Sequence, residues 1–492
     1  MRWHETPSRL AGILPIGAVV LASSLLSGQA LAQSVTSDAS GLTTVTPGGG
    51  GTFSITGGSP SGTNLFHSFD EFSIPHSGSA TFNNALTVSN IISRVTGTAA
   101  SDIQGTISAQ GTANLFLINP NGIVFGPNAQ LAIGGSFIGS TAESIQFQNG
   151  VSYLASDTTP NPMLSVSVPI GLQLGASSQT IRVEDTGATA LFPQPAVVDS
   201  SSSLLVNSGQ TFALIGNGIT FQGGKVAIPG GRIALGSVQE GLVTLNAAGW
   251  IPSYENITNF ADIDLIERSL LNASSVLFDT STIALDPITG QPQPLNPVTG
   301  IVDFGTPLPV FPAGQGGNIQ LDGRRLSMSG SSLALIQNFG PLASGSVDVH
   351  ARERVELADA DVSRVISSGL ITNHLSSGGG GGINVTTPQL LLINDGLIAT
   401  DTFSPANNAA QAGKITLRTD NIEITDVAQV AAGRRTLGGI TASSSGTGQG
   451  GVIDIETDTL NISGDGIASG ANRLGTAGNV IVVADALRIT NS

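Results

Sequence analysis

The fold is decided by residues 114–137, which read NLFLINPNGIVFGPNAQLAIGGSF. An unbroken apolar run from Leu115 to Ile118 leads into NPNG at residues 119–122, which suits a type I turn with Pro at its second position. Ile123 to Phe125 is again apolar on successive residues, so both faces of this segment are expected to be covered. Residues 126–128 (GPN) make a second turn. The stretch therefore predicts short buried strands joined by a rigid corner.

Short strand–turn–strand units recur along the rest of the chain, each opened by a glycine. Their side chains alternate: Ile453 and Ile455 are expected to point inward, and Asp454, Glu456 and Asp458 outward. Units of roughly 30 residues with a period of two are typical of a β-solenoid, and few aromatic residues argue against a propeller. We predict an all-β fold, a parallel β-helix of stacked coils. The leading glycines are Gly317, Gly345, Gly381, Gly413, Gly451 and Gly478.

Two segments interrupt this pattern. Residues 155–200 are rich in Pro, Ser and Thr, and residues 284–316 form a Pro-rich insertion, so both are expected to be loops. The final apolar run ends at Ile489. Because an open last coil exposes strand edges, either a cap or further sequence is expected there.

Composition excludes several classes of protein. The 492 residues include 64 Gly and 24 Pro but no Cys, and only 11% are charged, which excludes a coiled coil and a disulfide scaffold. The formal net charge is −16, and basic residues occur at most in adjacent pairs. Since nucleic-acid binding depends on neutralising phosphates, nucleic acid is not expected as a partner.

The N-terminus has the pattern of a signal peptide, residues 1–32. Arg2 and Arg9 give a positively charged start that precedes a short apolar stretch, and Ala30-Leu-Ala32 is a small–x–small cleavage site that would make Gln33 the first mature residue. A transmembrane anchor is the alternative, but the apolar stretch is short for a membrane span. An exported chain without cysteine suits passage through a second membrane, because disulfides formed on the way would block an unfolded chain.

Residues 119–123 (Asn119, Pro120, Asn121, Gly122 and Ile123) resemble the conserved pentapeptide of the filamentous haemagglutinin N-terminal, or two-partner secretion (TPS), domain family. The family's second tetrapeptide is not intact, and its counterpart is Asn83 and Asn84 within NNAL at 83–86. Residues 64–72, 90–97 and 103–107 extend the resemblance to this family. Later segments, residues 209–215, 229–236 and 254–257, resemble large cyanobacterial exoproteins.

This resemblance implies a right-handed, single-stranded parallel β-helix with an N-terminal cap. It implies a TPS domain over residues 33–200, including the Pro/Ser/Thr loop region, followed by a β-helical repeat region over 201–492. The general secretion machinery would deliver the chain to the periplasm. POTRA domains of a partner Omp85-type outer-membrane β-barrel transporter would recognise it there, with residues 119–123, Asn83 and Asn84 as the secretion motifs. The chain would then act at the cell surface or in the medium as an adhesin-like structural protein with a cell-surface or glycan ligand.

The alternative function is a secreted β-helical polysaccharide lyase or hydrolase. Its candidate groups lie at i, i+2 spacing on predicted outward faces, which a solvated face produces by default. No Ser-His-Asp motif is present, and no histidine has a partner at metal-ligand spacing. We therefore predict no enzyme activity, no catalytic or metal-binding residues and no cofactor. The candidate groups are Asp359 with Asp361, Asp454 with Glu456, and Arg352-Glu-Arg354.

Overall fold

The computed structural model describes residues 34–160, 162–193, 196–198, 200, 204–277, 314–358, 367–375, 377–403, 411–425, 438–464, 466–471 and 475–490. The chain divides into two compact units, residues 1–32 and 33–492, and every described residue belongs to the second. Regular structure among these residues is β-strand, apart from a 3₁₀ turn at Gly49–Gly51. No helix in the described part is long and apolar enough to cross a membrane.

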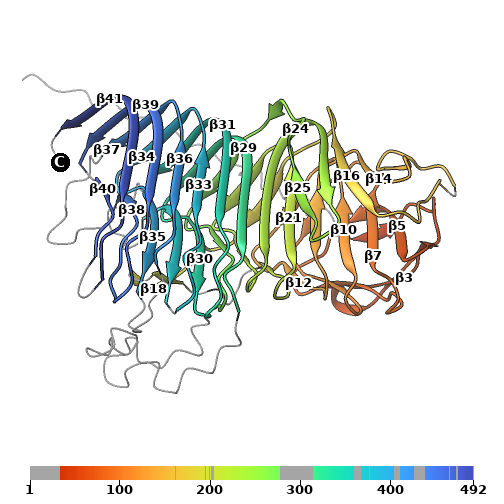
Figure 1. The fold of residues 1–492 in the computed structure, drawn as a ribbon. Helices are drawn as coiled ribbons and strands as arrows, with labels where there is room; N and C mark the ends of the chain where they lie inside the picture. The colour runs from red at the N-terminus through yellow and green to blue at the C-terminus, as the bar shows by residue number, and fades with distance from the viewer. Residues whose placement is uncertain are drawn as a thin grey trace, which may run out of the picture. The chain divides into compact units, whose positions relative to one another are not determined.

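Parallel pairing between successive coils builds the fold, and the strands lie side by side in chain order (Figure 1). The first ladder of parallel strands contains β5 (Asn64–Phe72), β7 (Asn90–Val95), β10 (Asn114–Ile118), β13 (Phe137–Ser140), β21 (Thr211–Gly216), β24 (Arg232–Asn246), β29 (Asn318–Ser329), β31 (Val347–Ala358), β33 (Ile383–Thr386), β36 (Ile415–Arg418), β39 (Ile453–Ser463) and β41 (Val480–Thr490).

Two further faces are built in the same way. The second ladder contains β8 (Ser101–Ile103), β11 (Ile123–Phe125), β17 (Ile181–Glu184), β22 (Ile219–Gln222), β27 (Ile263–Ile266), the second halves of β29 and β31, β34 (Gln389–Ile393), β37 (Asn421–Thr425) and the second halves of β39 and β41. The third face begins with β3 (Thr52–Gly57), β6 (Ser79–Phe82), β9 (Thr106–Ala109) and β12 (Gln130–Ala132). It continues with β20 (Leu204–Leu205), β23 (Lys225–Ala227), β28 (Leu270–Asn272), β30 (Leu333–Asn338), β32 (Gly369–His374), β35 (Leu397–Thr402), β38 (Gly439–Thr441) and β40 (Ile467–Ala468). These ladders confirm the predicted parallel β-helix.

Alternation along each strand fills the core. Ile453 and Ile455 are fully buried, while Glu456 and Asp458 are exposed, as the sequence predicts. Equivalent residues of neighbouring coils stack in register, so each coil covers the apolar side chains of the one before it. One such buried row consists of Ile319, Val347, Ile383, Ile415 and Ile453.

Antiparallel strands close the N-terminal end and confirm the predicted cap. β1 (Val35–Ser37) and β4 (Ser59–Ser61) pair with β5, and β2 (Thr43–Pro47) pairs with β3. These strands satisfy backbone groups that the first coil would otherwise leave open at its edge.

The expectation of a continuous loop over residues 155–200 is wrong. β16 (Pro169–Leu174) and β17 lie there, together with the hairpin of β18 (Ala190–Pro193) and β19 (Ala196–Val198). Pro169 is tolerated because it stands at the first position of its strand. Of the other expected loop, residues 284–313 lie outside the described part of the chain.

A second sheet lies outside the β-helix. β14 (Ser144–Phe147) pairs antiparallel with β15 (Ser152–Leu154) and β16, and the second half of β24 joins β16 to β25 (Ile251–Ser253). β26 (Asn259–Phe260) also pairs antiparallel with β24. This outer sheet buries aromatic side chains against the outward faces of β5, β7, β10, β13 and β21. Its cluster includes Phe66, Phe116, Phe147, Tyr153 and Trp250.

Three asparagines stack on successive coils at the start of β5, β7 and β10. The amide of Asn90 donates to the Oδ1 atom of Asn64 at 2.9 Å, and that of Asn114 donates to the Oδ1 atom of Asn90 at 2.9 Å. The amide of Asn64 in turn donates to the carbonyl oxygens of Ser165 and Ser167. The last amide of this asparagine ladder is therefore bound by residues 165–167, the segment that leads into β16 of the outer sheet.

Replacing Asn90 with alanine should lower the free energy of unfolding by about 2 kcal/mol, because it leaves the buried Oδ1 atom of Asn64 without its donor and the amide of Asn114 with only the carbonyl oxygen of Ser89 as acceptor. Urea unfolding measures this loss. The control is Asn461→Ala, since Asn461 is exposed on β39 and should change stability by less than about 0.5 kcal/mol. Equal effects of the two substitutions would contradict the ladder's role.

Candidate functional site

The turn at residues 119–122 joins β10 to β11 and is organised by a buried asparagine. Asn119 is fully buried, and its amide donates to the carbonyl oxygen of Ala99 at 3.0 Å and to Oγ of Ser101 at 3.0 Å. Its Oδ1 atom accepts hydrogen bonds from the backbone and side-chain nitrogens of Asn121 at 3.0 and 3.1 Å. All the hydrogen-bonding capacity of the Asn119 side chain is thus used inside the fold.

The same turn connects the coil before it with the coil after it. The amide of Asn121 donates to the carbonyl oxygen of Gly97 at 2.8 Å, and Gln179 N–H donates to the carbonyl oxygen of Pro120 at 2.9 Å. Ile123 is fully buried, and Gly122 has a φ of 115°, which favours glycine. Only Pro120 and Asn121 of residues 119–123 are partly exposed, so the turn is a brace between coils.

The second predicted motif lies elsewhere, after β6 on the third face. Asn83 is exposed, and its amide donates to Oγ of Ser54 at 2.8 Å. Asn84 is buried, donates to the carbonyl oxygen of Gln110 at 3.0 Å and accepts from Gln110 N–H at 2.9 Å. Among the hydrogen bonds of the described residues, none joins this pair to residues 119–123. The two motifs therefore each bind their own neighbouring coils.

A buried cation, which sequence reasoning missed, ties the cap to the outer sheet. Arg94 in β7 is 0% exposed. Its Nε donates to Oγ of Ser68 at 2.8 Å, Nη2 to Oγ of Ser40 at 3.2 Å, and Nη1 to the carbonyl oxygen of Leu154 at 2.6 Å. The guanidinium also lies 4.3 Å from the centre of the Tyr153 ring. The sequence signal that could have revealed this site is a charged residue inside the largely apolar run NIISRV, residues 90–95.

Asp38 supplies the negative charge of this network. Its carboxylate accepts hydrogen bonds from the hydroxyls of Ser68, Ser40 and Thr96 at 2.6 to 2.8 Å. Partial burial raises the pKa of Asp38, but these hydrogen bonds outweigh it and hold the pKa below its usual value. Burial raises the pKa of Tyr153 to about 12, and its hydroxyl donates to the carbonyl oxygen of His67. The cap, the first coils and the outer sheet thus share one polar network.

Comparison with known proteins assigns this region to a family. The sequence matches the family described as TPS secretion domain over residues 32–283, which contain the turn, the cap and the outer sheet. The chain belongs to the TPS secretion domain family. It is therefore an exoprotein of two-partner secretion, the route by which proteins with this domain are secreted.

Solved structures of two secretion domains are similar to the TPS chain. One is the HMW1 secretion domain from Haemophilus influenzae, with 16% identity and a TM-score of 0.43, covering 93% of this chain and 99% of that one. The other is the filamentous hemagglutinin secretion domain, with 14% identity and a TM-score of 0.30, covering 92% of this chain and 100% of that one. A search of curated proteins returned no match.

Asp454 and Glu456, two candidate catalytic carboxylates of the TPS chain, are engaged in ion pairs between coils. Lys414 and Arg418 contact Asp454 at 2.6 and 3.3 Å and hold its pKa below the usual value, which suits a permanent anion rather than a general acid. Arg418 also contacts Glu456 at 3.3 Å. Asp359 and Asp361 lie outside the described residues. The TPS exoproteins form a secretion and adhesin family, not an enzyme family.

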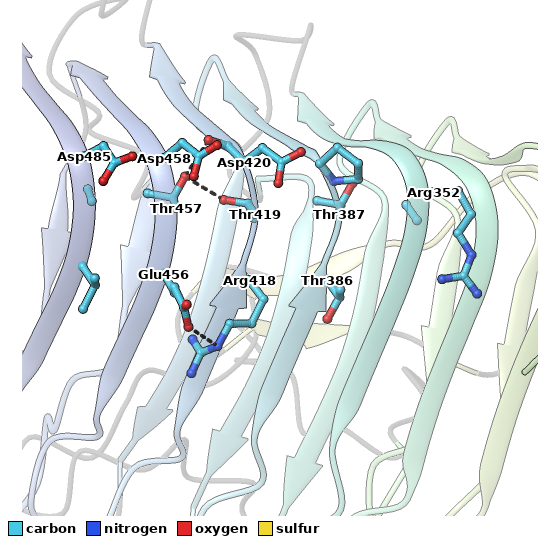
Figure 2. A pocket seen from close by; sticks show the side chains of 14 residues that line it. Arg352, Thr386, Thr387, Arg418, Thr419, Asp420, Glu456, Thr457, Asp458 and Asp485 are labelled. Atoms are coloured by element: carbon cyan, nitrogen blue, oxygen red, sulfur yellow. Dashed lines mark hydrogen bonds and ion pairs between the residues drawn. The ribbon is translucent and has the colours of Figure 1, made fainter.

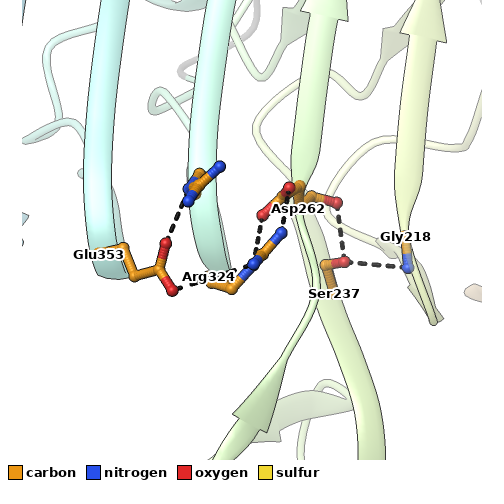
Figure 3. A network of polar contacts seen from close by, with 6 residues as sticks. Gly218, Ser237, Asp262, Arg324 and Glu353 are labelled. Atoms are coloured by element: carbon orange, nitrogen blue, oxygen red, sulfur yellow. Dashed lines mark hydrogen bonds and ion pairs between the residues drawn. The ribbon is translucent and has the colours of Figure 1, made fainter.

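The remaining candidates, Arg352-Glu-Arg354, adjoin a clamp at the point where β24 leaves the stack (Figure 3). Arg324 binds both carboxylate oxygens of Asp262 at 2.9 and 2.7 Å, and Arg325 binds Glu353 at 2.7 Å. Oγ of Ser237 donates to the carbonyl oxygen of Asp262 at 2.8 Å and accepts from Gly218 N–H at 3.1 Å. These charges hold coils together at the base of the outer sheet.

Acid should destabilise the TPS chain through two buried histidines. Burial lowers the pKa of His67, in β5, and of His374, in β32, to about 4 each. The unfolded state then binds more protons between about pH 6.5 and pH 4, so stability falls as pH decreases through that window, on the order of 3 kcal/mol per histidine. Asp401, whose pKa burial raises to about 6, opposes this loss because its native form takes up a proton in the same window.

Urea unfolding at pH 7 and at pH 4.5 tests the prediction. His67→Gln and His374→Gln should each reduce the difference in the free energy of unfolding between the two pH values. An unchanged difference in both variants would show that these histidines are not the cause. His76→Gln is the control, since His76 is exposed.

Proposed function

We propose that residues 33–200 are the part of the chain that a partner outer-membrane transporter recognises in the periplasm, through its POTRA domains. The family match over residues 32–283 carries this proposal, because a TPS secretion domain implies such a partner. The chain reaches the periplasm by the general secretion machinery, with residues 1–32 as a signal peptide cleaved between Ala32 and Gln33. These N-terminal residues lie outside the described part.

In this proposal, residues 119–123, Asn83 and Asn84 serve recognition by fixing the surface that the transporter contacts. The burial of Asn119, Gly122 and Ile123 supports an indirect role, since these side chains hold the backbone rather than present themselves. Pro120, Asn121 and Asn83 are the motif residues that offer accessible surface. A transporter contact would therefore involve these three residues together with backbone that the buried ones position.

After crossing the outer membrane, the chain acts at the cell surface or in the medium as an adhesin-like structural protein, with residues 201–492 as its β-helical repeat region. Fully buried rows and paired outward charges support a stiff structural role. A polysaccharide lyase or hydrolase remains the second candidate only through its fold, because the described candidate carboxylates are bound to basic side chains.

The experiment is to remove the partner transporter from the host and to fractionate the cells. The mature chain should then be found only in the periplasm, intact or as fragments, while a periplasmic protein that does not use this route keeps its distribution. Restoring the transporter should return the chain to the surface or medium. Unchanged export without any Omp85-type partner would refute the proposal.

A further inference from the structure

A buried tyrosine hydroxyl lies where the outer sheet meets the stack of coils. Tyr254 follows β25 and is only 4% exposed, and no described residue forms a hydrogen bond with its hydroxyl. The hydroxyl occupies the space that a Cβ atom on Gly236 would fill, so it lies against the outward face of β24. Because an unpaired buried hydroxyl costs free energy, such a group indicates a bound water molecule or ion.

A carboxylate and an imidazole continue the row that begins at Gly236. Asp322 in β29 is the register partner of Gly236, and His350 in β31 is the register partner of Asp322. Asp322 is 5% exposed, and Nδ1 of His350 lies 3.4 Å from its Oδ1 atom. This nitrogen is buried, and its contact with Asp322 lacks the alignment of a hydrogen bond. Three donor atoms, from Tyr254, Asp322 and His350, therefore follow one another along successive coils.

Gln320 holds the carboxylate in place. Its amide donates to Oδ2 of Asp322 at 2.9 Å and to the carbonyl oxygen of Pro252 at 3.2 Å, so it also joins β29 to β25. Side chains that orient a ligand in this way are typical of metal sites in proteins. Burial raises the pKa of Tyr254 well above its usual value, and the nearby charge of Asp322 adds to this rise. The phenol therefore lies close to the same carboxylate.

The charges around this row favour a cation. The charged groups that act on His350 are the carboxylates of Asp322 and Asp348 and the guanidinium of Arg352. The guanidinium lies 4.7 Å from the centre of the Phe260 ring, which stabilises its charge. Two carboxylates against one guanidinium leave an excess of negative charge beside the three donor atoms. An anion would be repelled here, whereas a cation would be attracted.

The row is open to solvent at its His350 end. The side chain of His350 is 43% exposed. The next register partner along the row is Thr386, which is exposed and lines a surface groove together with Arg352 and Arg418 (Figure 2). An ion can therefore enter from this groove and keep water molecules on that side, in addition to its three protein donors.

The spacing and chemistry of the donors match a transition-metal ion. Bonds of about 2.1 Å hold neighbouring donors roughly 3.0 to 3.4 Å apart, which includes the distance between His350 and Asp322. Imidazole nitrogen is a ligand of zinc, copper, nickel and iron, and carboxylate oxygen suits harder ions. A tyrosine must lose its proton to bind, which a highly charged ion promotes, and tyrosine oxygens are among the protein ligands of iron. The combination favours iron(III).

We propose that Tyr254, Asp322 and His350 bind one iron(III) ion, with Gln320 positioning the carboxylate. The ligands are the phenol oxygen, one carboxylate oxygen and Nδ1 of the imidazole. No group of three His, Cys, Asp or Glu side chains in the described part of the chain could hold a metal ion, and here the third donor is a tyrosine. Local spacing did not reveal the row, because its donors come from three coils. The proposal goes beyond the proposed function and does not depend on the route of export.

Titration of the purified chain with ferric nitrilotriacetate tests the inference. One iron(III) ion per chain should bind and produce the visible charge-transfer band of an iron–phenolate bond. Tyr254→Phe should lose the band and weaken binding at least about tenfold, since loss of a mere outer partner of a metal ligand already costs that much. Tyr153→Phe is the matched control and should keep the band, because the chain's other tyrosine donates to the carbonyl oxygen of His67.

His350→Gln should weaken binding by a similar factor, and His76→Gln, at an exposed histidine, should not. Tyr254→Phe removes a hydroxyl without a hydrogen bond among the described residues, and His350 is partly exposed, so both variants should fold, as circular dichroism can verify.

Three results would overturn the inference. The first is the absence of saturable iron(III) binding. The second is bound iron without the band, or a band that persists in Tyr254→Phe, since either would show an adventitious ion only. The third is tighter binding of zinc than of iron(III), which would contradict the assignment of the ion.

Discussion

Substituting Arg94 with methionine should lower the free energy of unfolding of the N-terminal coils by about 4 kcal/mol, one of the two largest effects expected of a single replacement here. The guanidinium is fully buried and donates to Ser40, Ser68 and the carbonyl oxygen of Leu154. Methionine fills much of the space but removes the donor that these three acceptors share. Urea unfolding and hydrogen exchange over residues 34–160 measure the loss.

The control is Arg182→Met, on the outward face of β17. Arg182 pairs with Glu184, but its side chain is 50% exposed, so its loss should change stability by less than about 1 kcal/mol. A similar small effect at Arg94 would mean that the cap and the outer sheet are held together without it. Faster hydrogen exchange confined to residues 34–160 in Arg94→Met would instead show that the loss of stability lies in the segment that Arg94 contacts.

Asn119→Ala should cost about 3 kcal/mol and reduce export of the chain severalfold. The substitution removes four hydrogen bonds at a fully buried position, which leaves Ala99, Ser101 and Asn121 without their partner. The turn then loses the Asn119 contacts to the coil at 97–101, while its backbone contact with Gln179 in the next coil remains. Stability comes from urea unfolding of the purified chain, and export from the ratio of external to cell-associated protein.

Asn128→Ala is the matched control, because Asn128 occupies the next turn of the same segment but is exposed. Its free energy of unfolding should stay within about 0.5 kcal/mol of that of the unsubstituted chain. Its export should stay within twofold. If Asn119→Ala destabilises the chain but leaves export unchanged, the turn has a structural role only. If neither quantity changes, the brace itself is refuted.

The repeated elements could be read from the sequence because each coil carries its own local signal. Alternation at Ile453, Asp454, Ile455 and Glu456 predicts which side chains are buried without knowledge of any partner strand. The turn at residues 119–122 was likewise predictable from its residue types. Its buried hydrogen bonds to residues 97–101 were not, because they join different coils.

Long-range antiparallel pairing explains what the sequence did not reveal. β16 pairs with β14 and with β24, which lies some seventy residues further on, and no local pattern encodes that choice. Proline and serine in residues 155–200 therefore suggested a loop where strands are present. Arg94 was visible as a charge within an apolar run, but its partners come from three distant segments, around residues 40, 68 and 154.

The most direct test of the account is an export measurement on two internal deletions in a host that carries the partner transporter. Deleting residues 64–137 removes the asparagine ladder, Arg94 and the turn at 119–122. Deleting residues 383–414 removes one repeat and joins Gly382 to Ile415, the register partner of Ile383. The account predicts that the first chain stays in the periplasm while the second still appears outside the cell. Export of the chain lacking residues 64–137 at the level of the intact chain would contradict it.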